Sequence, residues 1–181
     1  MIEAFVGLGS NLGDRLGNLG AAVDRLAREP GFTLRKVSLA YESEPIGPPQ
    51  PGYLNAVAQV GTLLAPRATL NRLRAIEEAM GRMRRERWGS REIDLDLLLF
   101  GDKVIDQTGL QIPHPLLAER AFVLEPLCEV APDAWHPILK MTAGELRTRL
   151  KPEDRSQVRA WRPIRRSLDE PQAEEEAPRE P

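Results

Sequence analysis

The segment from Arg87 to Phe100 carries the residue types best suited to chemistry. An arginine-rich stretch runs directly into an expected strand, in which successive side chains point to opposite faces. From Ile93 onward the alternation predicts two faces: Ile93, Leu95, Leu97 and Leu99 on one, and Asp94, Asp96, Leu98 and Phe100 on the other. The first face can be buried in a core. The second presents two carboxylates roughly 7 Å apart along the strand.

Paired carboxylates beside arginines favour chemistry on a nucleoside polyphosphate. Mg²⁺ in proteins usually takes one or two carboxylates and completes its shell with water and substrate phosphates. Guanidinium groups donate forked hydrogen bonds that match phosphate oxygens. Residues 82–91 supply five of these groups, at Arg82, Arg84, Arg85, Arg87 and Arg91.

A simpler interpretation is that both features face solvent. An arginine-rich loop is most often just solvated, and two aspartates can lie on the open face of a strand. Aspartate is, however, depleted in strands, and here two aspartates directly follow the arginines. This adjacency favours a site.

Composition limits the class of protein. The 181 residues contain 25 Lys and Arg against 27 Asp and Glu, so the net charge is −2 and one basic loop stands out. That balance fits a small anionic ligand better than nucleic acid, which would require a wider basic surface. The single cysteine, Cys128, excludes an intramolecular disulfide and favours the cytoplasm. We expect no membrane span, no signal peptide and a monomer.

Hydrophobic periodicity predicts an alternating order of strands and helices. Strands are expected at 2–8, at 32–41 with a bulge near 35–36, from 53 onward, and at 93–100; helices are expected at 14–28 and at 66–80. The Pro- and Gly-rich residues 44–52 indicate a loop. Beyond the last strand, 113–130 predicts a loop followed by a helix, and 142–150 a short helix.

This order predicts an α+β fold of the ferredoxin-like type. Its βαββαβ core is an antiparallel sheet with helices on one face, followed here by C-terminal helical additions. The other face of the sheet would be free for a site that includes Tyr53, Asn55, Asp94 and Asp96. We expect one domain at 1–162 and a disordered acidic tail at 163–181.

Other nucleotide and metal motifs do not fit. Gly7-x-Gly9 follows a strand, but Leu12 occupies the place of the third glycine of a dinucleotide fingerprint. No Walker-type phosphate loop occurs in the sequence, and one cysteine with two distant histidines does not build a zinc site.

Four motifs together resemble the 6-hydroxymethyl-7,8-dihydropterin pyrophosphokinase family of folate biosynthesis. They are Gly7–Arg15, Tyr53-Leu54-Asn55, Arg87–Asp96 and Pro113-His114. The resemblance covers roughly residues 1–140. It implies that the pterin hydroxymethyl oxygen attacks the β-phosphorus of ATP, so that diphosphate is transferred and AMP is released.

The resemblance also implies a role for each matching residue. Asp94 and Asp96 would hold two Mg²⁺ ions, and Asp96 would orient the attacking hydroxyl or take its proton. Tyr53 and Phe122 would sandwich the pterin ring, and Asn55 would bind its polar edge together with Ser43, Pro45 and Ile46. Arg82, Arg91, His114 and Arg120 would contact phosphates, with Arg82 and Arg91 counted as catalytic. Arg84, Arg87 and Trp88 would lie on a mobile loop that closes over ATP, and Glu77 would lie at the ATP site.

The chain departs from the family at a few positions. Ser43 and Glu44 stand where Thr and Pro are common, and Arg74 differs near the nucleotide. Two other functions remain open from the residues alone. One is a non-catalytic nucleotide or RNA binder on a ferredoxin-like sheet, which the aspartates disfavour because they repel phosphate without metal. The other is an interaction module, which would not bind ATP.

Overall fold

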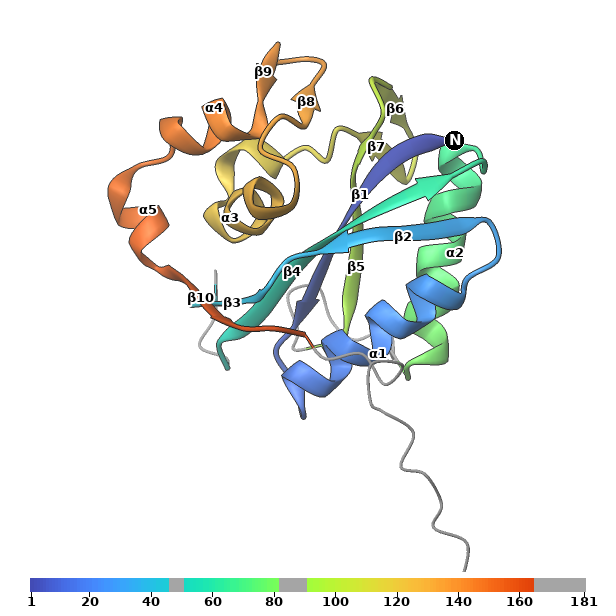
Figure 1. The fold of residues 1–181 in the computed structure, drawn as a ribbon, viewed down its shortest axis with the longest axis horizontal. Coiled ribbons are helices and arrows are strands. Elements are labelled where there is room, and N and C mark those ends of the chain that lie inside the picture. Colours follow the sequence, from blue (N-terminus) through green and yellow to red (C-terminus); the bar gives the residue numbers. More distant parts are fainter. Residues whose placement is uncertain (46–50, 82–90, 165–181) are drawn as a thin grey trace, which may run out of the picture.

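The computed structural model describes residues 1–45, 51–81 and 91–164 (Figure 1). Its first half has the predicted order: β1 (Ile2–Ser10), α1 (Arg15–Arg28), β2 (Phe32–Val37), β3 (Ala40–Ser43), β4 (Tyr53–Thr62), α2 (Pro66–Ala79) and β5 (Asp94–Phe100). Of the tail expected to be disordered at 163–181, residues 165–181 fall outside the described residues, whereas Pro163 and Ile164 are described. The motion expected of loop 82–91 also falls outside them, apart from Arg91.

One antiparallel sheet organises these elements. Its strand order is β10-β3-β4-β1-β5, and β2 also pairs with β4. The prediction of a single strand at 32–41 is wrong, because this segment forms two strands separated at Ser38 and Leu39. The Ser38 hydroxyl accepts the Val57 N–H at 3.0 Å, so a side chain interrupts the backbone pairing there. The predicted bulge is confirmed by a register shift between Leu34 and Lys36.

Local signals set the two helices of the core. The Asp14 side chain caps α1 by accepting the Gly17 N–H, which satisfies a donor that the first turn leaves open. Pro66 begins α2, where a missing N–H costs nothing. Both helices pack on one face of the sheet around a core that includes Leu19, Leu26 and Leu73.

The second half of the chain covers part of the other face. Its elements are β6 (Ile105–Gln107), β7 (Leu110–Ile112), the short 3-10 helix η1 (Leu117–Glu119), α3 (Ala121–Val130), β8 (Trp135–His136), β9 (Met141–Thr142), α4 (Ala143–Arg149), α5 (Pro152–Ser156) and β10 (Val158–Arg162). Helices α3 and α4 pack on Phe5, Val57 and Leu98, forming a second core (Figure 1). The prediction that the second face of the sheet is left uncovered by helices is therefore wrong.

The alternation in β5 also differs from the prediction. Leu99 packs in the second core and Phe100 in the first, the reverse of the predicted faces. The cause is a bulge: Val6 pairs with Leu97 and Phe5 with Leu99, so Leu98 is the extra residue. The bulge lies beyond the aspartates, which keep their predicted common face.

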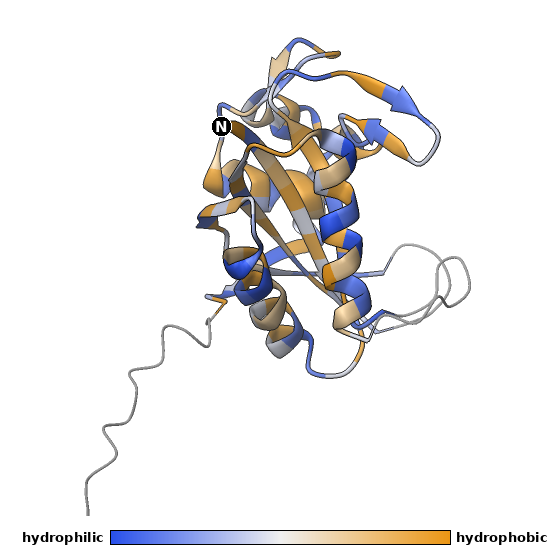
Figure 2. Cartoon of the chain, turned by 90° about the vertical axis from the view of Figure 1, so that its right-hand side faces the viewer, coloured by the Kyte–Doolittle hydropathy of each residue, from blue (hydrophilic) through white to orange (hydrophobic). Residues whose placement is uncertain are grey.

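The C-terminal strand β10 pairs with β3 and extends the sheet. Ile164, which follows it, packs against the first core. Figure 2 shows largely hydrophobic strands at the centre and hydrophilic residues on the surrounding helices. Among the described residues, no helix is long and apolar enough to cross a membrane.

Candidate active site

A cleft of about 480 Å³ gathers most of the predicted site residues. Its walls come from the strands β1, β3, β4 and β5, from α2, and from α3 with the segment that leads into it. The predicted residues that line it are Ser43, Tyr53, Asn55, Glu77, Arg91, Asp94, Asp96, His114, Arg120 and Phe122. Glu77 and Phe122 are separated by 45 positions in the sequence, so the fold assembles this set.

Two glycines of β1 open the floor of the cleft. Gly9 pairs with Asn55 of β4 on one side and with Asp94 of β5 on the other. Gly7 pairs with Asp96 in the same way. A Cβ at Gly9 would lie 3.5 Å from the Asn55 Oδ1 and would begin to fill the space between the amide and the carboxylates. Asn55 and Asp94 therefore face one bare strip, two strand spacings or about 10 Å apart.

The donor set on this strip suits Mg²⁺. Asp94 and Asp96 are hard oxygen ligands, and the Asp94 carboxylate is partly exposed. Within the described residues, no group of three or more His, Cys, Asp and Glu could hold a metal. Mg²⁺ needs no such cage, because water and substrate phosphates supply its remaining ligands. The residues present therefore fit the ion.

Arg91 and Glu77 hold the strand that carries the carboxylates. Arg91 Nη1 donates to Asp94 Oδ2 at 2.8 Å, which places a positive charge beside this carboxylate in the cleft. Glu77 is only 4% exposed, and its Oε1 accepts the Leu95 N–H at 2.7 Å. Leu95 lies between the two aspartates, so this buried carboxylate fixes the backbone that presents them.

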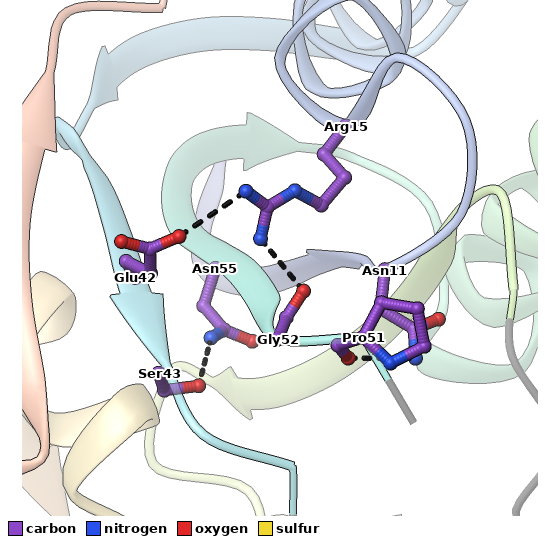
Figure 3. Close-up of polar contacts among 7 residues, drawn as sticks. All are labelled: Asn11, Arg15, Glu42, Ser43, Pro51, Gly52 and Asn55. Carbon is purple, nitrogen blue, oxygen red and sulfur yellow. Dashed lines mark hydrogen bonds and ion pairs between the residues drawn. The ribbon is translucent and has the colours of Figure 1, made fainter. Parts of the chain in front are cut away.

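The opposite end of the cleft has an amide and aromatic rings. The Asn55 Nδ2 donates to the Ser43 Oγ at 2.8 Å, and both side chains are buried (Figure 3). Burial raises the pKa of Tyr53, and nearby Asp94 raises it further against the opposing effect of Arg91. Tyr53 is therefore a neutral phenol. The ring of Phe122 lies 5.5 Å from the Arg120 guanidinium, within range of a cation–π contact.

His114 is a neutral hydrogen-bond donor. Burial lowers its pKa and the Arg120 charge lowers it further, with a smaller opposing effect of Asp94. Its Nδ1 accepts the Leu116 N–H at 3.2 Å. The proton of the neutral ring is therefore on Nε2, which can donate to a ligand oxygen.

Comparisons with known proteins show which family the chain belongs to. Residues 5–132 match the family model of 7,8-dihydro-6-hydroxymethylpterin-pyrophosphokinase. The chain belongs to this family. Similar curated pyrophosphokinases include one from Pseudomonas aeruginosa, 47% identical over 132 residues (72% of this chain and 82% of the relative). Another, from Aquifex aeolicus, is 39% identical over 155 residues (85% and 93%).

Solved structures of the pyrophosphokinase fold agree. The crystal structure of wild-type Plasmodium falciparum HPPK-DHPS with STZ-DHP superposes with a TM-score of 0.66 at 16% identity. It covers 81% of this chain, which spans 43% of that longer protein. At this identity the likeness concerns the fold alone, and it confirms the ferredoxin-like core.

Some predicted pyrophosphokinase residues are not seen in the cleft. Pro45 is described but does not line it. Ile46, Arg82, Arg84, Arg87 and Trp88 lie outside the described residues. Conversely, Arg74 and Glu44 do line it, although the family resemblance marks them only as departures. The helical spacing from Arg74 to Glu77 could have indicated that both face the same side of α2.

Proposed function

We propose that this pyrophosphokinase transfers the diphosphate of ATP to the hydroxymethyl oxygen of 6-hydroxymethyl-7,8-dihydropterin, a step of folate biosynthesis, and releases AMP. The observation that carries the proposal is the glycine strip of β1, open at Gly9 and bordered by the Leu98 side chain at Gly7, with an amide on one side and two carboxylates on the other. Membership of the family supports the same activity.

The amide end suits the pterin. Because the Asn55 Nδ2 donates to Ser43, its Oδ1 remains an acceptor that faces the strip. That acceptor matches the amino group in the substrate named for the curated relatives. The ring would lie between Tyr53 and Phe122, beside Ser43. Pro45, which does not line the cleft, and Ile46, outside the described residues, stay predicted contacts of the pterin. A two-ring molecule held at Asn55 would extend its hydroxymethyl group along the strip toward the carboxylates.

The carboxylate end suits the polyphosphate. Asp94 and Asp96 would hold Mg²⁺, for which we propose two ions, and the bound metal would supply charge neutralisation for the phosphates. Arg91, Arg120 and the Nε2–H of His114 would bind phosphate oxygens. Arg82, Arg84, Arg87 and Trp88, outside the described residues, stay predicted contacts of ATP. Glu77 stays a predicted ATP-site residue.

The reaction then requires positioning more than a strong nucleophile. The hydroxymethyl oxygen would attack the β-phosphorus, and the bond from that phosphorus to the α,β-bridging oxygen would break. AMP would leave with the bridging oxygen. Asp96 would orient the hydroxyl or take its proton. A monomer in the cytoplasm, with its domain at 1–162, stays a prediction.

Nucleotide chromatography tests the proposal. The purified chain, incubated with ATP, Mg²⁺ and the pterin, should form AMP and the pterin diphosphate, and AMP formation should require both pterin and Mg²⁺. Pterin-dependent ADP would instead identify a γ-phosphoryl kinase. ATP binding without consumption would favour the non-catalytic binder, and absence of ATP binding would favour the interaction module.

A further inference from the structure

The turn that joins β1 to α1 contacts two distant segments of the cleft wall. Residues 11–14 form this turn, and Gly13 adopts a φ of +67°, which favours glycine. The Asn18 side chain braces it by donating to the Leu12 carbonyl at 3.0 Å. The turn is therefore held in one conformation, from which its side chains can position neighbouring segments.

Asn11 binds both segments at once. It is only 1% exposed. Its Oδ1 accepts the Arg91 N–H at 2.8 Å, and its own N–H donates to the Arg91 carbonyl at 3.2 Å. Its Nδ2 donates to the Pro51 carbonyl at 3.4 Å (Figure 3). One amide thus connects the residue that pairs with Asp94 to the segment that leads into Tyr53.

Arg15 holds only the second segment. Its Nη1 donates to the Gly52 carbonyl at 2.7 Å, and its Nη2 pairs with Glu42 at 3.1 Å (Figure 3). Gly52 immediately precedes Tyr53, and Glu42 immediately precedes Ser43. Arg15 therefore braces the amide and aromatic end of the cleft.

We propose that Asn11 is a positioning residue that sets the pterin half of the cleft relative to the nucleotide half. The inference rests on the proposed function, since it assigns pterin to the Tyr53 end and nucleotide to the Arg91 end. Its two side-chain hydrogen bonds, here called its arms, are chemically separable. The oxygen holds Arg91, and the nitrogen holds Pro51, so different substitutions remove different arms.

Three variants separate these arms. Asn11→Asp keeps an acceptor for the Arg91 N–H but has no donor for Pro51, whereas Asn11→Ala removes both side-chain arms and keeps the backbone N–H that donates to the Arg91 carbonyl. Arg15→Ala removes the brace on Gly52 and spares Arg91. Asp14→Ala is the matched control, because it loses the N-cap of α1 in the same turn and touches neither segment.

Affinities are measured by isothermal titration. A non-hydrolysable ATP analogue with Mg²⁺ is titrated alone, and the pterin is then titrated with that analogue at saturation. Asn11→Asp and Arg15→Ala should weaken pterin binding about tenfold and nucleotide binding less than about twofold. Asn11→Ala should weaken both about tenfold. Asp14→Ala should lower the melting temperature and leave both affinities unchanged.

The outcomes distinguish the inference from the proposed function. If the wild-type chain forms no AMP, the proposed function fails, whatever the variants do. If the wild-type chain is active, equal losses for both ligands in Asn11→Asp overturn the separation of the arms. Unchanged affinities in Asn11→Ala, or the same losses in Asp14→Ala, would reduce Asn11 to a structural residue.

Discussion

Glu77 provides a direct test of how the fold presents the two aspartates. Its buried carboxylate accepts the Leu95 N–H at 2.7 Å. β5 is the last strand of the sheet order, so Glu77 takes the place of a neighbouring strand at that N–H. Glu77→Ala removes this acceptor and leaves a buried donor unpaired, whereas Glu77→Gln keeps a neutral oxygen in the same position.

The cost follows from the atoms removed. A hydrogen bond to a charged group is worth about 1.5–3 kcal/mol, and one buried methylene adds about 0.8 kcal/mol. Relief of the desolvated charge offsets part of this. We expect Glu77→Ala to cost about 2–3 kcal/mol and Glu77→Gln about 1 kcal/mol, since a neutral hydrogen bond is weaker. Each kcal/mol lowers the melting temperature of a chain this size by about 2–4 °C.

Calorimetry and steady-state kinetics measure the result. Glu77→Ala should melt about 4–12 °C below wild type, and Glu77→Gln about 2–4 °C below. Turnover of Glu77→Ala should fall by about 100-fold, because misplacing a reacting group by about 1 Å costs that much. A melting temperature of Glu77→Ala within about 1 °C of wild type would refute the reasoning. A higher KM for ATP in Glu77→Gln, with no change in melting temperature, would indicate direct contact with the nucleotide.

Three further predictions concern the metal ligands, His114 and the tail. Asp94→Asn and Asp96→Asn should each lower turnover by orders of magnitude without unfolding the protein, because a metal ligand supplies several kcal/mol; near-wild-type rates in either would remove it from the mechanism. Because the pKa of His114 is lowered in the folded state, the unfolded chain binds more protons. Stability should fall as the pH drops below about 6.5. His114→Gln should remove only part of the dependence of the melting temperature on pH between pH 5 and 7, since burial also lowers the pKa of His136. A pH dependence equal to that of wild type would contradict this. Truncation after Arg165 should preserve stability and turnover, since few large apolar residues are lost; a drop of several degrees would show that the tail packs on the domain.

Local patterns in the sequence were sufficient for most of the secondary structure. The helical stripe at Leu19 and Leu26, the cap at Asp14 and the alternation up to Leu97 depend on neighbours within a few positions. The same locality placed Asp94 and Asp96 on one face of one strand. Their chemistry could therefore be predicted before the fold was known.

Tertiary packing decided where those local rules stop. The alternation of β5 ends at Leu98, because a bulge opposite β1 turns Leu99 toward α3. The strand at 32–41 divides because the Ser38 side chain binds the backbone of β4. No period in the sequence encodes either event, since both depend on a partner strand that is distant along the chain.

Residue types and their spacing were enough to show which side chains could do chemistry, whereas the fold brought distant ones among them together. Asn11, Pro51 and Arg91 are separated by 40 positions or more, yet one side chain connects all three. Asn55 and Asp94 face one strip only because β1 lies between their strands with glycines at the contact. Such contacts depend on the register of the whole sheet, whereas side-chain alternation along a strand depends only on the local stereochemistry of the backbone.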